Sequence, residues 1–565
     1  MRRIAAIAIA VYLLFVLLDR FVLVELLVQR IGIPVLLAIV AAFACVGAGF
    51  LARHGRKDLA LNLIVGYPIF GTICFLVGVL KISIWTMVPV LAIFAIVGAF
   101  SVAPASPPAE ITRRPSHATI IAIAAVAFSS FMAAQAPPST LDELAYHLAV
   151  PWTWVKEARA IELPLSSHSY FPLGVESADL PVLTLLGTGG GIASHFLHLF
   201  AAIAATVLLF RAAGRDHFIV AAIITTPALV LTAGWSLVDW ELLGIAVALV
   251  MALEAEDALT VAAALGAGLL TKYTFIPLAI IAIVVTRKFR GVLPGLAIGS
   301  IFFLRNLILT GNLVAPFLTT LAPHVAPYRA GAFLSDYIFD GRFIDESLGA
   351  SLLMSCTLAT GILSWVLVAA GVALFALAPS ARLLVPFFAI PAARAITPGK
   401  VMRALLATAI AVQLFLIGYF TERTETFALL AGRVSDEQYL ATARPVTQTI
   451  AALDAALPPN SRTLVVGLSE TFWFQHRVRG GGNFDGPRVS AYLEGTPEAL
   501  RDKLRRDGIT HVAVISAPPA TKVVKKMEER ETALTPSANR SLTQMLDRYA
   551  ANVTQRGNAA LFALR

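Results

Sequence analysis

Long apolar segments follow one another through the first 420 residues of this sequence and constrain its fold more than any other feature. Only 14% of the 565 residues are charged, against about 25% in an ordinary soluble domain. About 13–14 segments are long enough, or nearly so, to cross a bilayer as a helix. The expected spans are 4–18, 32–52, 59–80, 84–103, 119–136, 192–212, 217–233, 237–253, 256–270, 273–286, 291–308, 352–377, 382–396 and 402–420. The sequence therefore predicts a polytopic α-helical membrane protein.

Basic residues gather in the connections on one side of these spans. The connections concerned are 2–3, 53–57, 113–114, 211–215 and 287–290. Because Lys and Arg mark cytoplasmic loops, this side is expected to be cytoplasmic. The outer side then receives 137–190, 234–238, the turn near Lys272 and 309–350. Topology thus accounts for the net charge of +9, and no nucleic-acid partner is expected.

The chain is expected to divide into three parts. Residues 1–104 predict a four-span N-terminal module, and residues 105–420 predict the main membrane domain, with an amphipathic segment at 137–190. Residues 421–565 are polar and predict a soluble α/β domain on the outer side. Its expected elements are a helix at 444–457, a strand at 463–467, a helix at 497–506 and a strand at 511–515. The glycine run at 480–482 predicts a loop with no helix start after it.

Two adjacent acids, Asp142 and Glu143, follow the span at 119–136. Charge near a bilayer is costly and is kept mainly where it has a function. One reading is structural, because Thr140 and Glu143 fit the S/T-x-x-E capping box of a helix start. The other is catalytic, with a carboxylate as the general base that takes a proton from an acceptor hydroxyl. The two readings are compatible. Spacing of the apolar residues predicts that the segment lies on the outer membrane surface as an amphipathic helix, interrupted at Pro151.

Further polar side chains fall on the same outer face. They are Tyr146, His147, His168, Glu176, Asp239, Lys272, Tyr273, Arg305 and Asn306. Each has a plain structural alternative: a lone His is usually structural, an acid beside Trp anchors a span end, and Lys272 can snorkel. Two cations beside several acids on one face can also hold an anionic leaving group and activate a nucleophile. The His and acid spacing matches no strong metal signature, so no metal ligands are assigned, and a divalent cation is left open.

These motifs together resemble one group of enzymes. They are Asp142…Tyr146-His147-Leu148…Pro151, His168-Ser169…Phe171-Pro172…Glu176, Thr271-Lys272-Tyr273-Thr274 and Arg305-Asn306…Pro316-Phe317, followed by the soluble α/β domain. The set resembles bacterial membrane glycosyltransferases of the GT-C class, which include protein O-mannosyltransferases and aminoarabinose transferases. The resemblance spans roughly residues 119–565. The chain departs from the class in its spans before the acidic loop and in Arg394-Ala395-Ile396-Thr397-Pro398, which replaces the usual signature near the last spans.

The resemblance implies a sugar transfer from a polyprenyl-phosphate donor to a lipid, glycan or protein acceptor, at the periplasmic face of the bacterial inner membrane. Asp142, with Glu143 beside it, would supply the catalytic base. Lys272 and Arg305 would hold the donor phosphate, and the other residues of the outer face would bind substrate. No nucleotide cofactor is implied. A secondary transporter and a non-catalytic envelope-assembly protein are the alternatives.

Overall fold

The computed structural model describes residues 31–102, 117–213, 217–285, 290–317, 366–372, 387, 389–391, 399–423, 425–482, 485–515 and 533–565. The expected first span at 4–18 lies outside these residues, as do Arg394 and most of the loop at 309–350. The expected spans at 352–377 and 382–396 are described only in part. The total number of spans therefore stays a prediction.

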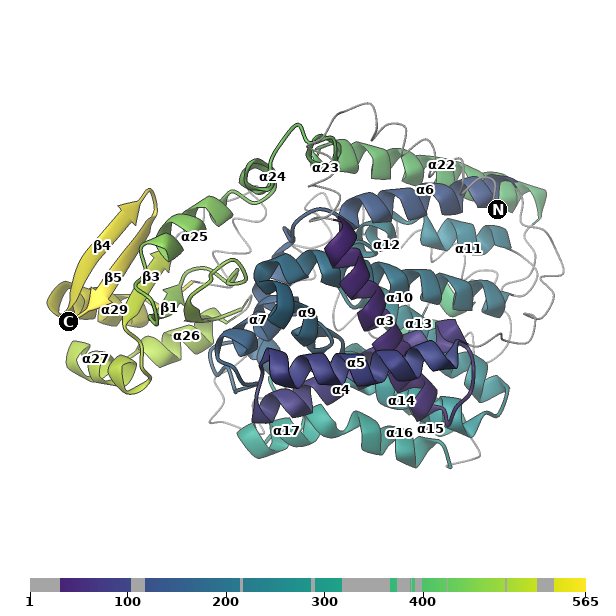
Figure 1. Cartoon of the computed structure of the whole chain (residues 1–565), viewed down its shortest axis with the longest axis horizontal. Coiled ribbons are helices and arrows are strands. Elements are labelled where there is room, and N and C mark those ends of the chain that lie inside the picture. Colours follow the sequence, from purple (N-terminus) through teal and green to yellow (C-terminus); the bar gives the residue numbers. More distant parts are fainter. Residues whose placement is uncertain are drawn as a thin grey trace.

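The membrane domain is a bundle of apolar helices (Figure 1). Among the described residues, four helices are long and apolar enough to cross a membrane, and one bent pair, which is either a broken span or a re-entrant loop, meets the same test when its two helices are taken together. The four are α3 (Ile33–Ala52), α4 (Leu59–Leu80), α5 (Ile84–Ser101) and the run Leu180–Ala213, which contains α9 (Leu180–Leu186), η4 (Gly187–Gly189) and α10 (Gly190–Ala213). The bent pair is α16 (Val292–Gly299) and α17 (Ile301–Thr310), which meet at 46°. The predicted polytopic helical fold is confirmed.

Helices that do not meet this combined test of length and hydropathy occupy other expected spans. They are α6 (His117–Ala134), α11 (His217–Ile224), α12 (Pro227–Thr232), α13 (Asp239–Glu254), α14 (Ala258–Thr271), η5 (Tyr273–Phe275), α15 (Ile276–Val285) and α22 (Lys400–Arg423). The span expected at 217–233 is broken, because Pro227 has no N–H to continue the first helix and starts a second one.

Close helix crossings hold the bundle together. Helix α4 packs against α3, α10 and α14, and a Cβ on Gly66 would lie 1.9 Å from the Cys45 carbonyl oxygen. Small residues let the backbones of membrane helices approach this closely. Large apolar side chains cover the outside, with Trp85 88% and Phe100 79% exposed. Helices α3 to α5, inside the module expected at 1–104, thus share one core with α10 and α14.

Charged side chains pair at one end of the bundle. Buried Arg53 donates to Asn62 Oδ1 at 2.7 Å and to Thr260 Oγ1 at 3.1 Å. Arg211 pairs with Asp58 at 2.8 Å, and the Asp58 carboxylate also caps the start of α4. The basic connections at 53–57 and 211–215, which were predicted on one side, therefore lie close together.

The outer segment (residues 137–190) is a chain of short turns rather than one surface helix. Before α9 it forms the π-helix η2 (Glu143–His147), α7 (Ala149–Lys156), the 3₁₀ turn η3 (Ser167–Tyr170) and α8 (Gly174–Ser177). Leu144 and Leu148 are fully buried, so the apolar spacing serves a core and not a membrane surface. Pro151 does not interrupt a helix. It lies in the first turn of α7, where its missing N–H costs nothing.

The C-terminal part is an α/β domain, as predicted. Its elements are α23 (Thr426–Leu430), α24 (Asp436–Ala443), α25 (Val446–Ala455), β1 (Arg462–Val466), β2 (Arg477–Gly480), α26 (Gly486–Leu493), α27 (Pro497–Arg506), β3 (His511–Ile515), α29 (Pro536–Tyr549), β4 (Ala550–Arg556) and β5 (Ala559–Leu564). The sheet order is β2-β1-β3-β5-β4. Strands β2, β1 and β3 are parallel, and β5 runs antiparallel to both β3 and β4. Helix α27 and strand β3 have the predicted bounds.

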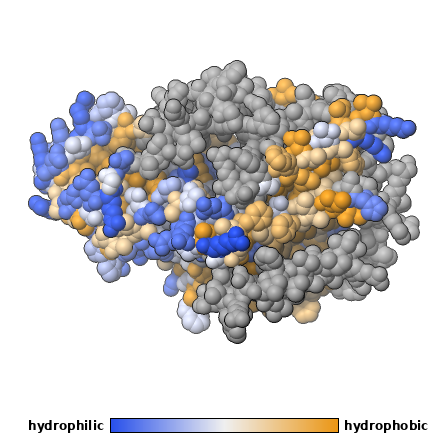
Figure 2. All heavy atoms as spheres, turned by 90° about the horizontal axis from the view of Figure 1, so that it is seen from above, coloured by the Kyte–Doolittle hydropathy of each residue, from blue (hydrophilic) through white to orange (hydrophobic). Residues whose placement is uncertain are grey.

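One expectation for this domain was wrong. The glycine run at 480–482 closes β2, and α26 begins at Gly486, so a helix start does follow it. Figure 1 shows the domain beside the end of the bundle that carries α7, and Figure 2 shows hydrophilic residues gathered over it and hydrophobic ones over the helical part. The outer segment therefore lies between the bundle and the sheet domain.

Candidate active site

The two adjacent acids of the outer segment have different surroundings. Asp142 has α-helical backbone angles and is partly exposed. Glu143 is fully buried, and its carboxylate accepts the N–H of Ser236 at 2.7 Å and the hydroxyl of Thr140 at 2.8 Å. It also contacts His195 Nε2 at 2.7 Å. Both oxygens of Glu143 are therefore engaged within the protein.

Glu143 also fulfils part of the predicted cap. Its carboxylate accepts the N–H of Thr140 at 3.1 Å, which is the return bond of a capping box. Burial acts to raise the pKa of Glu143, but the charge and hydrogen bond of His195, with the bond from Ser236, outweigh it and leave the pKa lowered. The side chain is thus held ionised at the joint between the outer segment, α10 and the turn before α13.

A histidine and a glutamate from opposite ends of the outer segment form a buried pair. His147 Nδ1 lies 2.8 Å from Glu176 Oε1, and both side chains are less than 5% exposed. The pKa of Glu176 is raised to about 8, chiefly by burial. Glu176 is therefore protonated at neutral pH, and the pair connects η2 to α8.

Aromatic rings line the space next to this pair. Tyr146 stacks on His168, with ring centroids 4.3 Å apart and an interplanar angle of 17°. Phe171 meets His168 edge-on at 5.0 Å and stacks on Phe317 at 5.8 Å, while Tyr273 meets Phe317 edge-on at 5.5 Å. The predicted residues Tyr146, His168 and Tyr273 thus belong to one aromatic wall.

Charged side chains from several parts of the fold act on His168. Its pKa is lowered to about 4 by burial, and of the nearby charges Asp142 acts to raise it while Lys272 and Arg488 lower it. Lys272 also acts on Glu176, lowering its pKa. The imidazole is therefore neutral at pH 7, within electrostatic reach of one carboxylate and two cations that come from different parts of the fold.

Arg305, Asn306 and Tyr273 hold the chain of the outer segment. Arg305 donates to the Ser169 carbonyl at 2.7 Å, and its guanidinium lies over the Tyr170 ring at 5.9 Å. The Asn306 amide donates to the Tyr170 carbonyl at 2.6 Å and to the Tyr273 hydroxyl at 2.8 Å. All three predicted residues reach the site, where they bind protein carbonyls.

Asp239 is buried at the start of α13. Two residues later, Glu241 accepts from His198 across a 2.9 Å contact. The neighbouring Ser194 hydroxyl donates to Asp179 at 2.8 Å. None of Glu241, His198, Ser194 and Asp179 was among the predicted site residues.

The sequence did contain a signal for this polar network. His195 and His198 are three residues apart in an apolar span, so they lie on one helix face. Ionisable residues inside a span are rare and call for a named partner. The partners, Glu143 and Glu241, lie 52 and 43 residues away in sequence, which is why spacing alone did not identify them.

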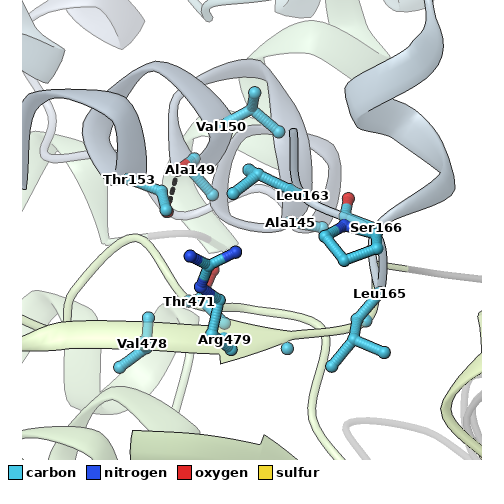
Figure 3. Close-up of a pocket in the computed structure, with 13 residues that line it drawn as sticks. Ala145, Ala149, Val150, Thr153, Leu163, Leu165, Ser166, Thr471, Val478 and Arg479 are labelled. Atoms are coloured by element: carbon cyan, nitrogen blue, oxygen red, sulfur yellow. Dashed lines mark hydrogen bonds between the residues drawn. The ribbon is translucent and has the colours of Figure 1, made fainter. Parts of the chain in front are cut away.

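A small cavity lies where the outer segment faces β2 (Figure 3). Figure 3 shows the Arg479 side chain reaching from its strand toward Ala149 and Thr153. The cavity is lined by Ala145, Ala149, Val150, Thr153, Leu163, Pro164, Leu165, Ser166, Thr471, Val478, Arg479, Gly480 and Gly481. Its volume of about 30 Å³ has room for one or a few water molecules and not for a sugar.

Metal ligands were left unassigned from the sequence. Within the described ranges, no group of three or more His, Cys, Asp or Glu side chains is arranged to hold a metal ion.

No model of a known protein family and no curated protein matches the chain. Two solved structures of ArnT from Cupriavidus metallidurans are similar to it. The one bound to undecaprenyl phosphate has 14% identity and a TM-score of 0.47, and the match covers 79% of this chain and 97% of that chain. The apo structure has 14% identity and a TM-score of 0.45, with the same coverage of 79% and 97%. ArnT is an aminoarabinose transferase, one of the enzymes that the sequence motifs resemble.

Proposed function

We propose that this protein is an inverting membrane glycosyltransferase. It moves a sugar from a polyprenyl-phosphate donor to an acceptor hydroxyl at the periplasmic face of a bacterial inner membrane, in the modification of an envelope lipid, glycan or protein. The resemblance of the sequence motifs to the GT-C class motivates the reaction type.

The observation that carries the proposal is the contrast between Asp142 and the acids around it. Glu143 is buried with both oxygens bonded, and Glu176 is paired with His147. Asp142 is partly exposed and lies within electrostatic reach of His168. A carboxylate with access to solvent, in otherwise dry surroundings, suits a general base.

The step follows from these groups. Asp142 takes the proton of the acceptor hydroxyl, whose oxygen forms a bond to the anomeric carbon of the sugar. The bond from that carbon to the phosphate oxygen breaks on the opposite face. Lys272 offsets the charge of the departing polyprenyl phosphate. Arg305 keeps the Ser169 carbonyl in place and contributes to the site by positioning.

The test uses Asp142→Asn beside the parent protein, both purified in detergent. Release of polyprenyl phosphate is measured with a panel of polyprenyl-phosphate sugars. We expect the substitution to reduce turnover by about 10²–10⁴-fold, the range of general-base catalysis, at an unchanged melting temperature. Equal turnover by both proteins would remove Asp142 from the chemistry, and a panel that the parent never turns over would count against the transferase.

One observation favours a proton-coupled secondary transporter as the second candidate. His195 and His198 lie inside the span Leu180–Ala213, each paired with a buried glutamate. Intramembrane His–carboxylate pairs occur in proton relays. Proton flux into reconstituted vesicles under an imposed pH gradient distinguishes the two functions. A transporter would lose this flux when His198 is replaced, whereas a transferase carries no proton flux with or without His198.

A further inference from the structure

The soluble domain binds the backbone of the π-helix that follows Asp142. The carbonyl oxygen of Leu144 accepts the N–H of Thr471 at 3.0 Å and the N–H of Phe472 at 3.2 Å. A π-helical turn is rare and frequently marks a functional site. Here two amides of the soluble domain satisfy a carbonyl only two residues from Asp142.

A second contact joins the soluble domain to the 3₁₀ turn that carries His168. The Asp485 carboxylate accepts the Ser167 N–H at 3.0 Å and the Gly482 N–H at 2.6 Å through the same oxygen, Oδ2. Asp485 is 1% exposed. This one buried oxygen therefore ties the residue before His168 to the glycine run after β2.

The glycine run lies directly against the His168 ring. A Cβ added to Gly482 would lie 2.6 Å from His168 Nδ1, a separation that real Cβ atoms do not adopt. A Cβ added to Gly480 would meet the Thr471 methyl at 3.3 Å as its nearest neighbour. The absence of a side chain at Gly482 is what lets His168 stack on Tyr146.

Arg488 completes this face of the soluble domain. It is 5% exposed, donates to the Pro164 carbonyl at 3.2 Å and lies over the Tyr170 ring at 5.3 Å. It is also one of the charges that act on His168. The soluble domain thus supplies both packing and charge beside His168.

We propose that the soluble domain is a wall of the active site, in which Gly482 and Asp485 are positioning residues that set His168 against Tyr146 beside Asp142. This inference rests on the proposed role of the Asp142 site. Under this proposal the soluble domain contributes residues to the active site, and it is not merely an appended module that recruits an acceptor.

The first test is hydrogen exchange of the full-length protein in detergent. Gly482→Ala should raise the exchange rate of peptides covering 141–149 and 165–172 by about tenfold, because the loop has to move from His168. Gly480→Ala, in the same run, is the matched control and should stay within about twofold of the parent. Equal exchange in both variants would overturn the proposal.

A double substitution shows whether Gly482 acts through His168. In a His168→Ala background the clashing ring is absent, so Gly482→Ala should add nothing further to the exchange of 141–149. Coupled residues are expected to be non-additive in this way. The same increment in both backgrounds would mean that the effect does not pass through His168, and would overturn the proposal.

Activity gives a readout that a merely structural role would not produce. Asp485→Ala removes the acceptor of two N–H groups and should lower kcat by about tenfold or more, with the donor KM changed by less than about twofold. Asp485→Asn keeps an oxygen that can accept both bonds and should restore kcat. Loss of folding, or equal loss in both variants, would contradict the positioning role.

Different results would contradict the proposed function and the proposed role of the soluble domain. If the parent turns over no polyprenyl-phosphate sugar, the proposed function fails, while exchange in the Gly482 and Gly480 variants still judges the placement of His168. If the parent is active, and Gly482→Ala matches Gly480→Ala in both activity and protection from hydrogen exchange, the proposed transferase function stands. The proposed role of the soluble domain in the active site is then refuted.

Discussion

At the scale of single residues, neighbouring acids of the same charge have separate roles because their partners differ. Glu143 binds His195 and Ser236 on other helices, while Asp142 keeps access to solvent. Those partners lie 52 and 93 residues away. A sequence pattern can therefore find the pair of acids, but it cannot decide which of them is fully buried.

Stability should distinguish the two acids. Glu143→Ala leaves His195 and the Ser236 N–H without their buried partner, and breaking a buried pair typically costs about 3–5 kcal/mol. We expect a clear fall in the melting temperature in detergent. Asp142→Asn, at the adjacent position, is the control and should melt with the parent. A melting temperature of Glu143→Ala equal to that of the parent would refute the anchoring role.

Glu176 should make stability depend on pH. Its pKa is raised from 4.5 to about 8 in the folded protein, mainly by burial. Between these values the folded state keeps a proton that the unfolded chain has released, so the contribution of Glu176 to stability is greatest below pH 4.5 and is lost as pH rises through about 8. The slope for one proton is at most about 1.4 kcal/mol per pH unit.

Melting temperatures measured between about pH 6 and 9 test this linkage. The parent should lose stability with rising pH, and Glu176→Gln, which cannot ionise, should lose less. If the two profiles run parallel, Glu176 is not the group that titrates.

At the scale of elements, prediction succeeded where local signals were complete. Helix α27 begins after Thr496, whose hydroxyl accepts the Ala499 N–H, and ends before Gly508 with its φ of +73°. Strand β4 has no comparable signal, because its sequence is mostly polar and its place depends on pairing with β5. The short turns of the outer segment were missed since their apolar residues pack on two domains at once.

Helix crossings in the membrane domain should be sensitive to a single methyl group. Gly66→Ala places a Cβ 1.9 Å from the Cys45 carbonyl, and overpacking of this kind costs about 1–3 kcal/mol. We expect a lower melting temperature. Gly418→Ala in α22 is the matched control, because nothing lies within 4 Å of its added Cβ. A neutral Gly66→Ala would mean that α3 and α4 separate at little cost.

At the scale of the whole molecule, the two domains are joined through one shared carboxylate as well as through the site. Glu157 of the outer segment pairs with Arg462 at 2.7 Å and with Arg479 at 3.6 Å. Glu157 is 7% exposed, so solvent screens these pairs weakly. The cations come from β1 and β2, which places the parallel half of the sheet against α7.

Glu157→Gln should loosen this junction. Two arginines, with side chains 24% and 21% exposed, then lack their charged partner, and exchange of peptides over 462–480 should rise. The control is Glu498→Gln, whose pair with Arg548 is 48% and 59% exposed and is worth less than about 1 kcal/mol. If both substitutions leave exchange unchanged, the carboxylate does not hold the domains together.

The bond from the Trp152 indole N–H to the Phe474 carbonyl joins residues 322 positions apart in the sequence. A ribosome that has just released the outer segment still has to add the helices from α10 to α25, and then strand β1, before that bond can form. The nascent protein is therefore inserted in the membrane well before its site is assembled. A chain cut short before Phe474 would carry the helices of the membrane domain but not this bond.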